Sequence, residues 1–297
     1  MTQTSCGFVA IIGEPNTGKS TLINALVGQK ISITTPKAQT TRTNVRGVFS
    51  DIKTQMIFID TPGIFTTDQK FEKAMVKAAW SGAGDADAVL VMIDAQKGIT
   101  EGLKQLISTL APLAKKPLFA VINKLDKVNK ERLLELATAL SATKLFREIM
   151  FISALKNDGL EILKSTLSKV MPEGPFHYPD DAVSDVQMRM LAAEITREKL
   201  FLLMAQELPY ACLVETEKWD EGVGRIVISQ IIYVQRDAHK KMVIGEKGAM
   251  IKRIGSSARR ELEKMLEKKI HLELFVKVSA GWKDDKATYR LLGLDNI

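Results

Sequence analysis

One eight-residue segment near the amino terminus constrains the fold of this 297-residue chain more than any other feature. Residues 13–20 spell G-x-x-x-x-G-K-S, between an apolar run at 8–12 and a helix-forming stretch that begins at Ser20. A glycine-rich turn between a strand and a helix lets backbone N–H groups surround a polyphosphate at the positive end of the helix. Lys19 is then placed to reach the β and γ phosphates, and the Ser20 hydroxyl to bind Mg²⁺. We therefore predict a P-loop nucleotide site formed by Gly13, Glu14, Pro15, Asn16, Thr17, Gly18, Lys19 and Ser20.

A second segment, D-T-P-G at residues 60–63, ends the apolar run at 56–59. A carboxylate at the carboxyl end of a parallel strand can hold the Mg²⁺ shell, and this is the predicted role of Asp60. Gly63 leaves room for its N–H to approach a γ-phosphate. Alone, such a segment is an ordinary turn, and its meaning comes from its place behind a P-loop. The predicted nucleotide contacts in this segment are Asp60, Thr61, Pro62, Gly63 and Ile64.

Two further segments predict which base is bound. One follows the apolar run at 118–122 and ends in Asp126, and the other follows the run at 149–152. The Asp126 carboxylate can accept two hydrogen bonds, from the N1–H and the exocyclic amine of guanine. Adenine lacks this donor pair, and a site built on such bonds rejects the wrong base by about 10⁴-fold or more. The ligand is therefore predicted to be GTP or GDP, held by Asn123, Lys124, Leu125, Asp126, Ser153 and Ala154.

These four segments resemble the G1, G3, G4 and G5 motifs of the translation-factor-related GTPases. The remaining motif of that family, G2, should lie between Lys30 and Arg46, where the chain contains Thr40 and Thr41. One threonine would close on Mg²⁺ and the γ-phosphate, which would make this loop a switch. The resemblance favours Thr41 from its place before Arg42. The alternatives are Thr40 and a surface loop without a switch role.

Two residues bear on the rate of hydrolysis. Ile64 follows D-T-P-G, and an aliphatic side chain can neither polarise nor orient a water, so we expect slow intrinsic hydrolysis. Related GTPases with a hydrophobic residue there use the P-loop asparagine, here Asn16, to coordinate K⁺, which could replace the charge of an arginine finger. The alternative is that Asn16 only braces the loop. The predicted catalytic residues are Lys19, Thr41, Gly63 and Asn16, and the predicted metal ligands are Ser20, Thr41 and Asp60.

The order of elements divides the chain into two domains. Residues 1–172 alternate apolar runs with amphipathic stretches such as 129–141 and 158–170, for which Asn129 and Asp158 are the expected N-caps. This alternation predicts a Ras-like α/β three-layer sheet with its ligand loops at the carboxyl ends of the strands. Three prolines and one glycine within 171–181 predict a linker, which we place at 173–184. The expected strands are 6–13, 43–50, 54–60, 86–94, 117–123 and 147–153.

Residues 185–297 are predicted to form an α+β domain in the order α-β-β-α-α-β. A long helix at about 185–206 precedes strands at 210–216 and 224–235, and a last strand covers 270–278. The motif V-I-G-E-K-G at 243–248, between two helices, resembles that of a type II KH domain. In such domains the G-x-x-G turn clamps a nucleic-acid backbone, because residues without side chains let phosphates approach helix N-termini.

Local charge agrees with a phosphate-binding turn. The window 236–260 contains eight basic and two acidic residues, a net charge of +6 against +7 for the whole chain. A basic stripe around a glycine turn is the electrostatic signature of nucleic-acid binding. Arg259 and Arg260 lie among glutamates, and the alternative for them is a solvated helix face. The predicted RNA contacts are Lys240, Lys241, Val243, Ile244, Gly245, Glu246, Lys247, Gly248, Ile251, Lys252 and Arg253.

Together, the two domains resemble the Era-type family of bacterial ribosome-assembly GTPases over essentially the whole chain. The resemblance implies GTP-switched binding to the 3′ end of 16S ribosomal RNA during 30S maturation, and peripheral association with the inner membrane. The chain has neither a basic amino-terminal segment nor an apolar run of 18 residues, so we expect a cytoplasmic protein, as a monomer. Two alternatives stay open: an RNA tether that barely hydrolyses GTP, and a P-loop kinase or ATPase, against which Asp126 argues.

Overall fold

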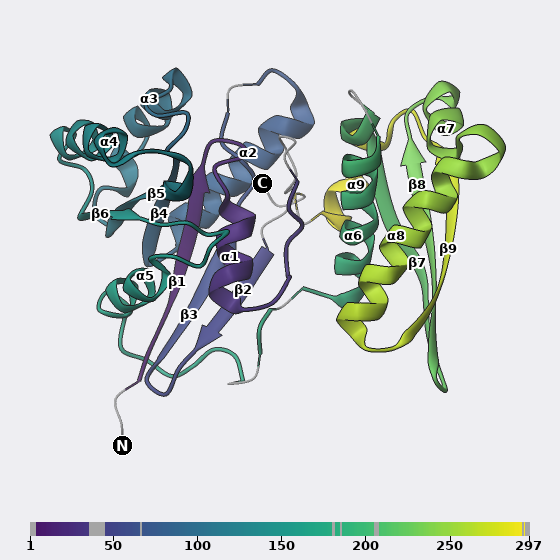
Figure 1. The fold of residues 1–297 in the computed structure, drawn as a ribbon, viewed down its shortest axis with the longest axis horizontal. Helices are drawn as coiled ribbons and strands as arrows, with labels where there is room; N and C mark the ends of the chain where they lie inside the picture. The colour runs from purple at the N-terminus through teal and green to yellow at the C-terminus, as the bar shows by residue number, and fades with distance from the viewer. Residues whose placement is uncertain are drawn as a thin grey trace. The chain divides into compact units, whose positions relative to one another are not determined.

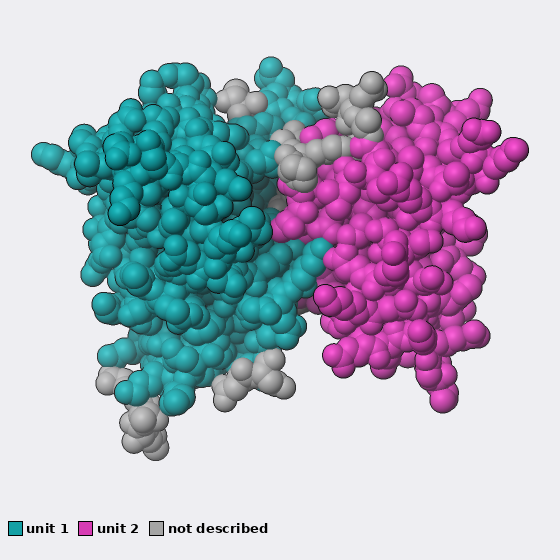
Figure 2. All heavy atoms as spheres, viewed as in Figure 1, with its two compact units in different colours: residues 1–32, 41–185, 292–297 teal, residues 33–40, 186–291 magenta. Residues whose placement is uncertain are grey.

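The computed structural model describes residues 4–35, 45–65, 67–179, 182–184, 186–204, 208–292 and 294. The chain forms two compact units, shown in different colours in Figure 2. Unit 1 consists of residues 1–32, 41–185 and 292–297, and unit 2 consists of residues 33–40 and 186–291. The division after residue 185 lies beside the predicted start of the second domain. The grouping of residues 33–40 with unit 2 was not expected from the sequence.

Unit 1 is built on a six-stranded sheet in the order β2-β3-β1-β4-β5-β6 (Figure 1). Strand β2 pairs antiparallel with β3, and the other neighbours pair in parallel. Strands β3, β4 and β5 are buried along their whole length, which explains their continuous apolar runs. The strands are β1 (Ser5–Gly13), β2 (Val45–Ser50), β3 (Thr54–Asp60), β4 (Ala88–Asp94), β5 (Leu118–Asn123) and β6 (Glu148–Phe151).

Helices cover both faces of this sheet, which confirms the predicted three-layer fold. Side chains of α2, α3 and α4 form one hydrophobic cluster with β1, β4 and β5. Helix α1 packs on the opposite face, where its Ile23 lies over Gly47 of β2. The helices are α1 (Lys19–Val27), α2 (Lys70–Asp85), α3 (Glu101–Ser108), α4 (Lys130–Ala142) and α5 (Leu160–Ser168), with short 3₁₀ turns η1 (Ala111–Leu113) and η2 (Leu125–Lys127).

The two predicted N-caps have different outcomes. Asn129 caps α4 as expected, because its side chain accepts a hydrogen bond from the Arg132 N–H at 3.0 Å. The prediction for Asp158 is wrong, because the residue that precedes α5 is Gly159, in the left-handed conformation with a φ of 75°. A Cβ at Gly159 would lie 2.5 Å from the Phe151 carbonyl oxygen, so the chain needs glycine at this close approach.

The segment predicted as a linker packs along unit 1. The buried Gln55 side chain accepts hydrogen bonds from the backbone N–H groups of His177 (2.8 Å) and Tyr178 (2.9 Å) and donates one to the Tyr178 carbonyl (2.9 Å). Further along, Val48 donates its backbone N–H to the Val183 carbonyl at 2.9 Å. These bonds fix the described part of the segment to strands β2 and β3.

Unit 2 has a three-stranded sheet in the order β7-β8-β9, in which β8 pairs antiparallel with β7 and in parallel with β9. Helices α6 and α8 cover one face of this sheet through two hydrophobic clusters (Figure 1). The predicted α-β-β-α-α-β order is confirmed, and a short last helix was not predicted. The elements are α6 (Met188–Leu203), η3 (Leu208–Ala211), β7 (Cys212–Gly222), β8 (Arg225–Val234), α7 (Asp237–Ile244), η4 (Glu246–Gly248), α8 (Ala249–Leu266), β9 (Lys269–Val278), η5 (Trp282–Asp284) and α9 (Lys286–Leu291).

Across the described ranges, no helix is both long and apolar enough to cross a bilayer.

Candidate functional site

The P-loop connects β1 to α1 through backbone conformations that glycine makes possible. Gly18 has a φ of 98° and directly precedes Lys19, the first residue of α1. At Gly13, with a φ of 153°, a Cβ would lie 2.6 Å from the Met92 carbonyl oxygen. The loop therefore presents backbone at the amino end of a helix, which is the geometry that binds phosphate.

Lys19 is held inside this loop. Its ammonium donates hydrogen bonds to the carbonyl oxygens of Gly13 (3.1 Å) and Glu14 (3.0 Å), and the residue is only 6% exposed. Burial lowers the pKa of Lys19 to about 8, and the nearby Asp60 and Glu14 carboxylates oppose this shift. A polyphosphate beside the ammonium favours its charged form, so Lys19 is suited to bind an anion.

Oxygen groups gather around the Asp60 carboxylate at the end of β3. Asp60 Oδ2 accepts hydrogen bonds from the hydroxyls of Ser20 (2.8 Å) and Ser32 (2.7 Å). Asn24 fixes Ser32, since Asn24 Oδ1 accepts the Ser32 N–H at 3.0 Å and Asn24 Nδ2 donates to the Ser32 carbonyl at 2.7 Å. The contact of Ser32 was not predicted, and no local sequence pattern marks it.

The donors around Asp60 fit Mg²⁺. This ion prefers one or two carboxylates together with hydroxyl, water and phosphate oxygens, and Ser20 and Asp60 supply the first two kinds. The predicted third ligand, Thr41, and its alternative Thr40 lie outside the described residues.

Asn123 joins three of the predicted motifs. Its Nδ2 donates to the Thr17 carbonyl at 2.8 Å, and its Oδ1 accepts the Ala154 N–H at 3.0 Å. The residue is 3% exposed, so both bonds are shielded from water. Asn123 thus holds the P-loop and the 153–154 turn on either side of the carboxyl end of β5.

Lys124 and Asp126 hold the 123–126 segment in place through their side-chain hydrogen bonds. Lys124 has a φ of 68°, and its ammonium donates to the Asn16 carbonyl at 2.9 Å and to Asp94 Oδ2 at 2.6 Å. Asp126 Oδ1 accepts the Ser153 hydroxyl at 2.6 Å, and this bond lowers the pKa of Asp126, which keeps the carboxylate an acceptor. Asp94 was not predicted, although it ends the apolar strand β4 just as Asp60 ends β3.

Residues 61–64 lie against the P-loop. At Gly63, a Cβ would lie 2.9 Å from Pro15 Cγ, so glycine permits this approach. Thr61 is fully buried, and its hydroxyl donates a hydrogen bond to the Ile11 carbonyl at 2.7 Å. Ile64 donates its N–H to the Gly13 carbonyl at 3.0 Å, and its side chain packs against the core cluster of unit 1.

In unit 2, the predicted G-x-x-G turn lies between α7 and α8. Gly245 (φ 73°) and Gly248 (φ 79°) have positive φ, and a Cβ at Gly245 would lie 2.6 Å from Met250 Cβ. Lys247 at the tip is exposed, as are Lys241, Lys252 and Arg253 of the flanking helices. Val243, one of the predicted RNA contacts, is fully buried in the core beneath the turn, so its side chain does not reach the surface.

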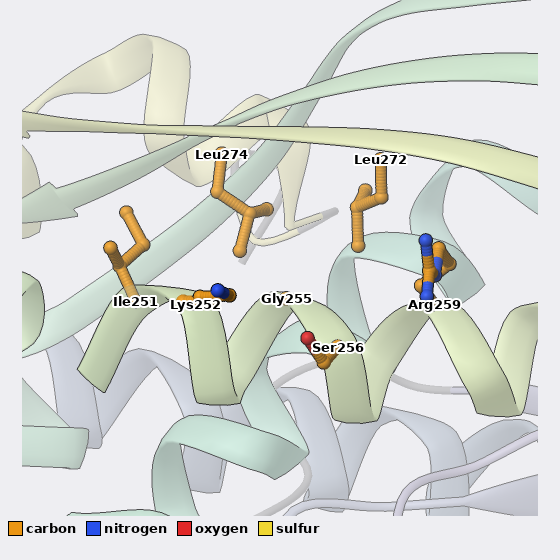
Figure 3. Close-up of a pocket in the computed structure, with 7 residues that line it drawn as sticks. All are labelled: Ile251, Lys252, Gly255, Ser256, Arg259, Leu272 and Leu274. Atoms are coloured by element: carbon orange, nitrogen blue, oxygen red, sulfur yellow. The ribbon is translucent and has the colours of Figure 1, made fainter. Parts of the chain in front are cut away.

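A groove of about 280 Å³ follows the turn, between α8 and β9 (Figure 3). Its apolar wall comes from Ile251, Leu272 and Leu274, and Lys252 and Arg259 carry charge along its rim. Two small residues, Gly255 and Ser256, leave the space open. A Cβ at Gly255 would lie 3.3 Å from Leu274 Cδ1. Of these residues, the sequence prediction included only Ile251 and Lys252.

Known proteins match nearly the whole chain. The family model of 50S ribosome-binding GTPases matches residues 8–124, and the KH-domain model matches residues 207–283. GTPase Era of Brucella suis is 49% identical over 295 residues, covering 99% of this chain and 94% of that protein. GTPase Era of Afipia carboxidovorans is 48% identical over 293 residues, covering 98% and 95%.

Two solved structures match at a TM-score of 0.93 and 40% identity, over 98% of this chain and 99% of theirs. One is Era in complex with MgGDPNP and nucleotides 1506–1542 of 16S ribosomal RNA, and the other is an Aquifex aeolicus Era variant bound to GDP·AlF₄⁻.

Proposed function

The chain belongs to the family of Era GTPases, and we propose that it is a GTP-controlled RNA-binding protein that assists maturation of the 30S ribosomal subunit. As a member of this family it hydrolyses GTP to GDP and phosphate, which excludes the kinase and ATPase alternative. Phosphate release under single turnover separates this enzyme from a tether that barely hydrolyses GTP. The observation that carries the RNA proposal is the 40% identity over 98% of the chain to the Era bound to 16S RNA. Its RNA target is proposed to be the 3′ end of that RNA.

The nucleotide chemistry that we propose follows from the site. Backbone N–H groups of residues 14–19 would hold the phosphates with Lys19, and Asp126 would select guanine. Ser20 and Asp60, with Thr41, would hold Mg²⁺, which neutralises phosphate charge when it is bound with GTP. Because the Ile64 side chain packs into the core, it orients no water, and hydrolysis is slow without further help. K⁺ beside Asn16 is the help that we propose.

The RNA site that we propose combines the glycine turn with the groove between α8 and β9. Phosphates would approach the amino end of α8 at Gly245–Gly248, and exposed lysines would neutralise them. Bases would enter the groove, whose apolar wall and charged rim suit unpaired nucleotides (Figure 3). Gly255 and Ser256 add no bulky side chain to the α8 side of this groove.

Filling the groove tests this site. We expect Gly255→Leu to weaken binding of an RNA that corresponds to nucleotides 1506–1542 of 16S ribosomal RNA by tenfold or more, because the new side chain would occupy the groove. Gly281→Leu is the control, since a Cβ at Gly281 meets no atom within 4 Å. Charge reversal at the turn, with Glu246→Asp and Lys247→Asp together, should also weaken RNA binding and leave GDP affinity unchanged. If both groove and turn variants bind this RNA as the parent does, the proposal is wrong.

We further propose that residues 32–34 couple the two sites. Ser32 is bonded to Asp60 in unit 1, and two residues later the Thr34 N–H donates to Glu198 Oε1 of α6 at 2.9 Å within unit 2. Glu198 is buried, and its other oxygen accepts from Lys199 at 2.8 Å. We propose that a displacement of Ser32 at the metal site is transmitted to Thr34, because the two residues are only two positions apart in the chain. Thr34 is in turn bonded to the buried Glu198 of unit 2.

Removing the Glu198 carboxylate tests this coupling. We expect Glu198→Ala to reduce the ratio of RNA affinities measured with a non-hydrolysable GTP analogue and with GDP. Glu261→Ala is the matched control, because Glu261 also pairs with Lys199 but is not bonded to Thr34. An unchanged ratio in the Glu198 variant would contradict the proposed connection.

The protein is proposed to act as a monomer in the cytoplasm. We also propose, from the family resemblance, peripheral attachment to the inner face of the membrane. Fractionation of cells in low and high salt tests it, because a peripheral protein appears with membranes only at low salt. A protein that stays in the soluble fraction in both conditions would contradict membrane attachment.

A further inference from the structure

Unit 2 contains a second cavity, on the face of its sheet opposite α6 and α8. Ile232 and Val234 of β8 point into the core with those helices, so Tyr233 between them points to the other face. There, residues of η5 and α9 cover the end of the sheet and leave a cavity of about 180 Å³. This cavity is separate from the groove between α8 and β9, with which it shares no residue.

Fixed aromatic rings line this cavity. Trp282 is 2% exposed, and its indole N–H donates to the Ala211 carbonyl at 3.2 Å, so the ring is held in place. The Tyr233 hydroxyl is hydrogen-bonded to Glu215, and burial together with this carboxylate raises the pKa of Tyr233 to about 12. The phenol therefore stays neutral and donates a hydrogen bond to the Glu215 side chain.

Oxygen acceptors complete the lining. The Glu215 and Asp285 carboxylates both line the cavity, from β7 and from the residue before α9. Thr288 of α9 lines it as well and is 5% exposed.

This lining matches one kind of group. Two carboxylates exclude phosphate and favour a cation, and aromatic rings favour a cation with a flat face. A guanidinium is flat, always charged, and carries five N–H donors for the carboxylate and hydroxyl oxygens. The Lys283 ammonium lies 5.8 Å from the centre of the Trp282 ring, within the range of a cation–π contact. We propose that the cavity binds the arginine side chain of a partner protein.

The test uses the full-length protein and a small probe, N-acetyl-arginine amide. We expect saturable shifts of the Trp282 indole resonance in NMR spectra. Two probes separate charge from shape: N-acetyl-citrulline amide is flat and neutral, and N-acetyl-lysine amide is charged without the planar fork. Each should bind at least tenfold more weakly than the arginine probe. Spermidine distinguishes arginine from a polyamine, and it too should bind more weakly.

Substitutions of the carboxylate residues that line the cavity test whether the arginine probe binds there. Glu215→Gln and Asp285→Asn should each weaken binding of the arginine probe by tenfold or more, and unchanged RNA affinity would show that unit 2 of each variant is folded. Glu217→Gln is the matched control, since it removes the same charge from the same strand but does not line the cavity. Equal binding of citrulline, tighter binding of spermidine, no saturable shift, or equal loss in the Glu217 variant would each overturn the proposal.

Discussion

Asn123 offers the sharpest test of how the nucleotide site is held together. Replacing it with alanine removes the hydrogen bonds to the Thr17 carbonyl and the Ala154 N–H. Both groups would then be left without these bonds in a buried region, where Asn123 itself is only 3% exposed. A neutral hydrogen bond contributes about 1 kcal/mol net, and a buried group left unpaired costs about 1–3 kcal/mol. The two losses therefore sum to about 2–6 kcal/mol. A loss of 2 kcal/mol in binding lowers affinity about 30-fold.

Isothermal titration of GDP into the parent and Asn123→Ala proteins measures this effect. We expect at least 30-fold weaker binding, because the P-loop and the 153–154 turn are no longer tied to β5. Asn129→Ala is the control: it removes the N-cap of α4, which costs about 1 kcal/mol of stability, and should leave GDP affinity unchanged. Affinity of the Asn123 variant within twofold of the parent would refute the role assigned to this side chain.

Three further predictions concern the ligand. Asp126→Asn should shift preference from GTP to xanthosine triphosphate by about tenfold or more, since the amide donates where the carboxylate accepted. Equal GTP affinity in this variant and the parent would contradict the assignment. Hydrolysis should be faster in K⁺ than in Na⁺, and Asn16→Ala should abolish the difference. Identical rates in both salts would count against the cation. Finally, the pKa of Lys19 is about 8 without nucleotide and must rise beside phosphate, so GTP affinity should fall as the pH rises above 8. Calorimetry above pH 8 should show proton uptake when GTP binds; no uptake would contradict the buried ammonium.

The strands and the glycine turns could be predicted because their causes are local. A buried parallel strand is an apolar run, as in β4 and β5, and a turn with positive φ favours glycine, as at Gly18 and Gly245. The order of motifs at strand ends was enough to identify the ligand. The same local reasoning failed at Asp158, where a close approach to a distant carbonyl made Gly159 the capping residue.

What the sequence could not show depends on contacts between distant residues. Ser32 is hydrogen-bonded to Asp60, and Thr34 to Glu198, although these partners are far apart in the chain. Neither separation matches a helix or strand repeat that a sequence pattern could reveal. The groove along α8 depends on Gly255 and on Leu274, which belongs to a different element. Local motifs therefore predicted the chemistry of each site, and the packing of distant elements decided its shape.

The central claim is that nucleotide state controls RNA binding, and one measurement tests it directly. RNA that corresponds to nucleotides 1506–1542 of 16S ribosomal RNA is titrated into the full-length protein bound to a non-hydrolysable GTP analogue and, separately, into the protein bound to GDP. Coupling between two sites is typically about 1–3 kcal/mol, or about 5- to 150-fold, and the same factor must appear when nucleotide affinities are measured with and without RNA. We predict tighter RNA binding with the GTP analogue, by a factor in that range, and the same factor in the reverse experiment. Equal RNA affinities in the two nucleotide states would mean that the two units act independently, and the proposed switch would be wrong.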